Sequence, residues 1–132
     1  MSATPPDARA EARRWLGEAD EELLVATVLS DSERVPARAA CFHAHLAAEK
    51  TIKALLVLRG VLLPRSHDLI RLAQLLPSGD RARFDLEDLA ELNPWTIEGR
   101  YPADLGDIGS AGVGDLLDRA RRIVESVRPI FN

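Results

Sequence analysis

The 132-residue sequence predicts an all-α protein, and three observations support this fold class. Ala, Leu, Arg and Glu are abundant, and all four residue types favour helices. Apolar residues recur at helical spacing along three long segments. No alternating run of apolar and polar residues resists a helical interpretation. We therefore expect an antiparallel, up-and-down bundle of the four-helix type, built from about five helices.

The first helix is expected from about Asp7 to Ser30, because Pro5 and Pro6 prevent an earlier start and Asp7 is a suitable N-cap. Its second half is apolar nearly all round. Such a helix is usually buried on several sides, by its own bundle or by a partner chain. One apolar face consists of Ala12, Leu16, Ala19, Leu23 and Ala26, and it is widened by Trp15, Val25, Val28 and Leu29.

The second long helix is expected from Pro36, which suits a first helical turn, to Arg59. Gly60 follows as a left-handed C-terminal cap. The core face of this helix consists mostly of small residues, so a neighbouring helix can approach closely. These residues are Ala40, Ala44, Ala47, Thr51, Ala54, Leu55 and Leu58.

Two short helices are expected next. The first runs from His67 to Leu76 with Ser66 as its cap, and the second runs from an Asp80 cap to about Leu92.

Residues 93–114 differ from the rest, because they contain five of the eight glycines together with two prolines, a Trp and the only Tyr. A loop this long inside a compact domain is often functional. The last helix is expected from about Gly112 to Val127.

Length and charge limit the possible functions. A chain of this size predicts one domain over residues 1–132. The net charge of -4 does not indicate a broadly basic nucleic-acid-binding surface, although it permits a local basic patch. A single Cys excludes an intrachain disulfide and a four-Cys zinc site. With neither a long apolar run nor a signal peptide in the sequence, we expect a cytoplasmic protein that does not contact membranes.

A polar band on the second helix is the first candidate site. His45, Glu49 and Lys53 are spaced four apart and therefore share one helix face. They could form a metal site with His67 as a third ligand, or an ordinary Glu–Lys ion pair beside a histidine. The ion pair is the favoured interpretation because no further ligand spacing supports a metal. We expect neither a metal nor a cofactor.

A ribonuclease pair is the second candidate. Arg38 is separated from His43 by four residues and from His45 by six. In such a pair, His would act as acid or base and Arg would stabilise the charge on phosphate. The Arg content makes about one such match expected by chance, so the spacing alone carries little weight.

Arg100 and Tyr101 in the glycine-rich region allow two interpretations. Arg can hold a phosphate through two hydrogen bonds, and Tyr can stack on a base. Alternatively, Tyr101 closes the end of the bundle and Arg100 pairs with a carboxylate of the second helix, such as Glu49. The residues alone favour this second interpretation.

Four segments resemble the HEPN domain family, in the order expected for that family. They cover nearly the whole chain and include the positions that match family motifs. The matching positions are His43, Glu49, Lys50, Lys53, His67, Asp68, Arg100 and Tyr101. The segments are ARRWLGEADEELLVA (12–26), CFHAHLAAEKTIKALLVLRG (41–60), PRSHDLIRLAQLL (64–76) and RYP (100–102).

The resemblance implies an antiparallel helical bundle that dimerises through its long helices, and a choice among several functions. Some HEPN proteins resemble metal-independent ribonucleases, often toxins. Others accompany a minimal nucleotidyltransferase, and others are regarded as nucleotide-binding modules. The ribonuclease members carry their Arg–His motif near the start of the last helix, whereas residues 112–127 contain no His.

Three functional hypotheses follow. In the first, the chain is a homodimeric, non-catalytic module for a nucleotide or another phosphate ligand, and it works with a nucleotidyltransferase in a bacterial toxin–antitoxin-like system. Lys53 and Arg100 would hold phosphate and Tyr101 would pack on the base, with Glu49 and His67 in the same site. The second hypothesis is a ribonuclease toxin that cleaves RNA with Arg38 and His43 or His45. The third is a structural partner subunit whose polar band is only an ion-pair network.

Overall fold

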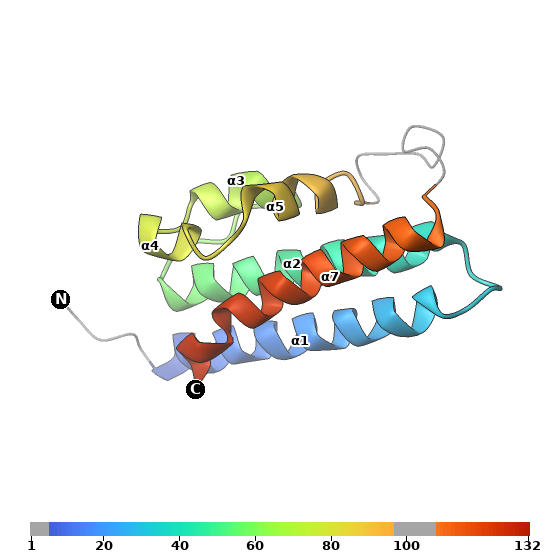
Figure 1. Ribbon diagram of the computed structural model, residues 1–132. Helices are drawn as coiled ribbons and strands as arrows, with labels where there is room; N and C mark the ends of the chain where they lie inside the picture. The colour runs from blue at the N-terminus through green and yellow to red at the C-terminus, as the bar shows by residue number, and fades with distance from the viewer. Residues whose placement is uncertain (1–5, 97–107) are drawn as a thin grey trace.

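The computed structural model describes residues 6–96 and 108–132, and these contain helices but no strand. Three long helices lie side by side, and a layer of short helices packs on two of them (Figure 1). The all-α prediction is confirmed. The long helices are α1 (Pro6–Ser30), α2 (Ala37–Leu58) and α7 (Ser110–Val127); the short ones are α3 (Leu69–Gln74), α4 (Ser78–Arg81) and α5 (Leu86–Leu92), and the 3-10 helix η1 (Arg128–Phe131) follows α7.

The chain reverses direction after each long segment, as an up-and-down bundle requires (Figure 1). α1 and α2 form an antiparallel pair with the most extensive packing in the described structure. The third leg of the bundle is divided among α3, α4 and α5, and α7 runs back beside α1 and α2. The predicted four-helix-type topology is therefore confirmed, with a third leg built from short pieces.

α2 is the central element, because it packs against α1, α3, α5 and α7. Its small residues, including Ala40, Ala44 and Ala47, are buried and allow the close approach that the sequence predicts. Larger side chains such as Ile52 and Leu55 fill the space toward the other helices. A polar side chain on the buried part of α2 must therefore find its partner inside the protein.

The start of α3 differs from the prediction. Ser66 does not cap this helix; instead, the Asp68 carboxylate accepts hydrogen bonds from the backbone N–H groups of Ile70 and Arg71. The Ser66 hydroxyl, two residues before this cap, accepts the backbone N–H of Asp68. A carboxylate that satisfies two backbone donors makes a strong cap, so the helix begins at Leu69.

The prediction of one helix from Asp80 to Leu92 is wrong, because two separate helices, α4 and α5, occupy this segment. Asp80 is buried, and its carboxylate accepts two hydrogen bonds from Arg59, at 2.6 and 3.0 Å. Asp80 lies inside α4, where it pairs with Arg59 and does not cap a helix. Asp85 caps α5 by accepting the backbone N–H of Glu87.

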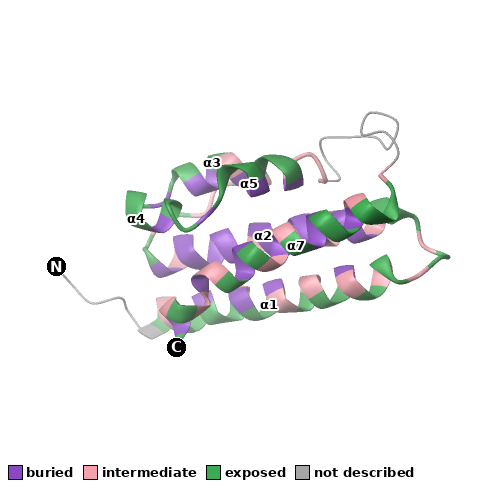
Figure 2. Cartoon of the chain, viewed as in Figure 1, coloured by how far each residue is buried: buried purple, intermediate pink, exposed green. Residues whose placement is uncertain are grey.

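The second half of α1 is only partly covered by the rest of the chain. Figure 2 shows exposed positions along this helix, opposite the buried side that faces α2 and α7. Leu24 and Val28 are 64% and 61% exposed, and Val25 is also exposed. The described residues of a single chain thus do not provide the expected burial on several sides.

Replacing glycine by alanine is expected to have opposite effects on stability at Gly60 and at Gly17. Gly60 has a φ of 74°, whereas Gly17 lies inside α1, and an added Cβ meets nothing within 4 Å at either position. We expect Gly60→Ala to lower the free energy of unfolding by about 1 kcal/mol, because the left-handed conformation disfavours Ala. We expect Gly17→Ala to raise it by about 0.5–1 kcal/mol, because Ala favours helix interiors. Urea denaturation measures both, and equal effects of the two substitutions would contradict the prediction.

Candidate functional site

The predicted polar band on α2 is buried inside the bundle. His45 is fully buried, and Glu49 and Lys53 are only 4% and 9% exposed. His67, from the segment before α3, joins them at an edge where 40% of its side chain is exposed. We call these four residues the Glu49 cluster. The structure thus brings together four of the residues that the sequence predicts for a site.

Both carboxylate oxygens of Glu49 are engaged. Its Oε1 accepts hydrogen bonds from His67 Nδ1 at 2.9 Å and from His45 Nε2 at 3.3 Å. Its Oε2 accepts from Lys53 Nζ at 2.9 Å. One carboxylate therefore connects three nitrogen donors that come from α2 and from the start of the third leg.

The His45 ring faces an acceptor at each nitrogen. Its Nδ1 lies 3.0 Å from the backbone carbonyl oxygen of Leu92, at the end of α5. A carbonyl oxygen and an ionised carboxylate can only accept, so both bonds form when both ring nitrogens carry hydrogen. The bond to Leu92 links α2 to the end of α5.

The charge on Glu49 is held by these donors. Burial raises the pKa of a carboxyl group, but the hydrogen bonds from His45, Lys53 and His67 and the positive charge of Lys53 outweigh it. They lower the pKa of Glu49 from 4.5 to about 2. The carboxylate is therefore ionised throughout the physiological pH range.

Lys53 also contacts α1. Its Nζ lies 5.8 Å from the centre of the Trp15 ring, within the range of a cation–π interaction. Trp15 is a partner that helical spacing alone did not assign to the polar band, although the sequence placed it on the widened face of α1. The interaction connects the Glu49 cluster to the first helix.

The exposed edge of the cluster is tied to the end of α5. Asn93 Oδ1 accepts the backbone N–H of Leu69 at 2.8 Å, and Asn93 Nδ2 donates to Asp68 Oδ1 at 3.1 Å. The hydrogen bond from the Arg71 N–H is the main reason why the pKa of Asp68 is lowered. These bonds fix the backbone directly after His67 and so help to position its ring.

The predicted ribonuclease residues have other partners. His43 lies on a different face of α2, and its Nδ1 is 2.7 Å from Glu22 Oε1 on α1. Lys50 donates to the second oxygen of Glu22 at 2.9 Å. Arg38 is exposed near the start of α2 and bonds to neither histidine in the described structure. The structure therefore does not assemble an Arg–His pair from these residues.

Two of the predicted site residues, Arg100 and Tyr101, lie outside the described residues. Within the described ranges, no group of three or more His, Cys, Asp or Glu side chains could hold a metal ion. His45, Glu49 and His67 do meet, but both histidines direct a ring nitrogen at a Glu49 oxygen as hydrogen-bond donors.

Comparison with known proteins identifies the family. The model of the HEPN domain matches residues 12–130, which is most of the chain. The chain belongs to the HEPN family. A crystal structure of ST0689, an archaeal HEPN homologue, has a similar fold, with a TM-score of 0.65 and 20% sequence identity over 100% of both chains. A search of curated proteins gave no match.

The described helices of this HEPN domain include none with both the length and the apolar character needed to cross a bilayer.

The pKa of Glu49 predicts a pH-dependent contribution to stability. Because the folded pKa is lowered from 4.5 to about 2, the contribution is fully present above pH 4.5 and is lost as the pH falls toward 2. It amounts to about 3 kcal/mol. We expect the difference in unfolding free energy between the wild type and Glu49→Gln to shrink by this amount between pH 6 and pH 2.

Urea denaturation at several pH values measures this difference. Glu18→Gln is the control, because it removes a largely exposed carboxylate that pairs with Lys50 outside the cluster. A Glu49→Gln effect that stays constant from pH 6 to pH 2 would show that the carboxylate is not held in its ionised form by the fold.

Proposed function

We propose that this HEPN domain is a dimeric, non-catalytic module that binds a nucleotide or another phosphate-bearing ligand at the exposed edge of the Glu49 cluster. We further propose that it works with a minimal nucleotidyltransferase in a bacterial toxin–antitoxin-like system. The observation that carries the proposal is the ionised Glu49, which holds His67 at the surface and binds Lys53 and His45 behind it.

The chemistry of the cluster favours binding over catalysis. A general acid or base is most effective when its pKa lies near the working pH, and the pKa of Glu49 is about 2. His45 is fully buried between two acceptors, so it is not accessible to an RNA backbone. The described part of the chain therefore gives no support to the ribonuclease alternative.

The exposed edge of the cluster offers an anion the His67 ring beside a balanced ion pair. The negative charge of Glu49 is balanced by the positive charge of Lys53, which donates to it. His67 is the exposed member, and we expect it to contact the phosphate directly. Lys53, which the sequence predicted as a direct phosphate ligand, would contribute its charge from behind Glu49. Arg100 and Tyr101 keep their predicted roles, on phosphate and base, in this proposal.

The exposed apolar face of α1 supports the dimer. Leu24 and Val28 lie one helical turn apart and expose most of their side chains, and Val25 is next to them. Exposed apolar groups of this kind mark interaction sites more often when they are contiguous. A second copy of the same helix would cover them.

Thermal-shift titration with ATP, GTP and a short RNA tests the ligand proposal. A ligand at 100 times its dissociation constant adds about 2.7 kcal/mol to stability, which raises Tm by about 10 °C for a chain of this size. We expect a shift with at least one nucleotide in the wild type. The shift should be lost in His67→Ala and in Arg100→Ala, because each removes a proposed phosphate ligand.

Arg34→Ala is the matched control, because Arg34 is an exposed arginine in the turn between α1 and α2. It should keep the full shift. The absence of a shift with every nucleotide would contradict the ligand proposal and favour the structural-partner hypothesis. Cleavage of the RNA in magnesium-free buffer, lost when His43 and His45 are both replaced by Ala, would instead support the ribonuclease.

Light scattering at micromolar concentration tests the dimer. We expect a dimer in the wild type and a folded monomer when Leu24 and Val28 are both replaced by Glu, because buried unpaired charges would oppose association. A wild-type monomer would contradict the proposal.

A further inference from the structure

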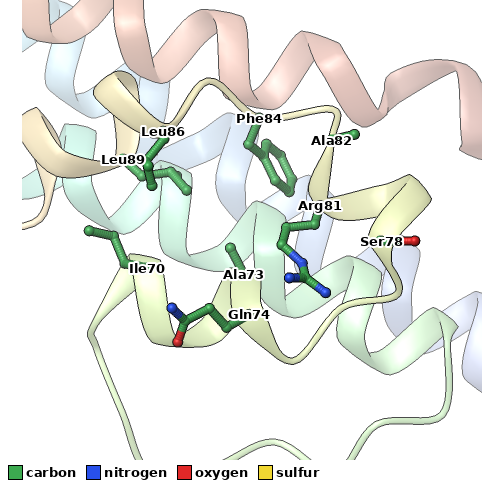
Figure 3. A pocket seen from close by; sticks show the side chains of 9 residues that line it. All are labelled: Ile70, Ala73, Gln74, Ser78, Arg81, Ala82, Phe84, Leu86 and Leu89. Atoms are coloured by element: carbon green, nitrogen blue, oxygen red, sulfur yellow. The ribbon is translucent and has the colours of Figure 1, made fainter.

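A pocket lies on the third leg of the bundle, between α3, α4 and α5 (Figure 3). Its volume is about 460 Å³, which falls within the usual range for small-molecule sites. It shares no lining residue with the Glu49 cluster. The proposed phosphate site therefore does not explain it.

The break between α4 and α5 helps to create this pocket. In one continuous helix over these residues, the Phe84 side chain would point in a different direction. Because the helix is interrupted, Phe84 is instead buried against the pocket. Ala73 of α3 is also buried and contributes only a methyl group, so space remains above it. Leu86 is strongly exposed at the pocket, although it is apolar.

Arg81 supplies a cationic group to this mostly apolar pocket. Its Nη2 donates to the backbone carbonyl oxygen of Leu76 at 3.3 Å, and it forms no ion pair with any described carboxylate. Its neighbours Arg59 and Arg83 both pair with Asp80. Arg81 therefore has no carboxylate partner within the described structure, while the two arginines around it share Asp80.

Arg81 is separated from the aliphatic side chains of the pocket. Figure 3 shows Arg81 on one side and Leu86, Leu89 and Ile70 on the other, with the Gln74 amide on the side of Ile70. An amphiphilic molecule with one anionic end matches this arrangement. A guanidinium binds a carboxylate through two parallel hydrogen bonds, and the apolar wall favours a hydrocarbon or aromatic body.

We propose that this pocket binds a small organic acid with a single carboxylate and an apolar body. The carboxylate pairs with Arg81. The apolar body lies against Ile70, Phe84 and Leu89. A phosphate monoester suits the pocket less well, because a single arginine leaves much of its charge and many of its acceptors unpaired.

Titration with 3-phenylpropanoate and octanoate, followed by ¹H–¹⁵N NMR of the full chain, tests this proposal. The amides of the two acids, 3-phenylpropanamide and octanamide, serve as uncharged probes of the same shape. We expect both acids to shift the backbone signals of Ala73, Arg81, Phe84 and Leu86 at millimolar concentration. We expect the amides to bind at least about tenfold more weakly, because they lose the charge-assisted pair.

Arg81→Gln should weaken binding of the acids about tenfold and bring their affinities close to those of the amides. Arg71→Gln is the matched control, because it removes an exposed arginine from α3 that does not line the pocket. It should leave the affinities unchanged. Ala73→Leu should abolish binding of acids and amides alike by filling the pocket.

Three results would overturn the proposal. The first is the absence of shifts at the lining residues with either acid. The second is equal binding of acids and amides by the wild type. The third is an Arg81→Gln variant that binds the acids as tightly as the Arg71→Gln variant does. None of these readouts depends on whether the Glu49 cluster binds a nucleotide.

Discussion

The Glu49 carboxylate is the point on which the described parts of the bundle depend. It is almost completely buried, and an isolated carboxylate there would be strongly unfavourable. Three donors offset this cost, and each of them belongs to a connection between elements. His67 stands before α3, His45 also reaches the end of α5, and Lys53 lies over Trp15 of α1. Removing one donor would leave a buried charge partly unpaired, which usually costs more than the pair contributes.

This arrangement also explains why the third leg can be built from short helices. α3, α4 and α5 are each too short to be stable alone, so their positions must come from tertiary contacts. His45 holds the end of α5, Asn93 joins that end to the start of α3, and Arg59 of the α2 C-cap holds α4 through Asp80. Buried polar contacts on or next to α2 thus position a segment that local propensity cannot. The same irregular segment leaves the pocket that contains Arg81.

Much of this architecture could be predicted from the sequence, because it rests on periodicity. The bounds of the long helices, the close-packed face of α2 and the shared face of His45, Glu49 and Lys53 all follow from helical spacing. The break after α4 could not be predicted in this way, because residues 82–85 contain no Gly or Pro and Asp80 resembles a cap. Its real partner, Arg59, is distant in sequence. The Leu92 carbonyl that bonds to His45 gives no sequence signal at all, since every residue has a carbonyl.

The family assignment and the fold agree, but neither specifies a ligand, because HEPN function depends on individual sites. The Glu49 cluster is the site with the clearest physical basis in the described residues, and its basis is a carboxylate that stays ionised. A ¹³C NMR titration of the Glu49 side-chain carboxyl from pH 7 downward measures this property in the folded protein. We expect its signal to remain that of a carboxylate well below pH 4.5, with a midpoint near the value of about 2. A midpoint at or above 4.5 would contradict a carboxylate held by His45, Lys53 and His67.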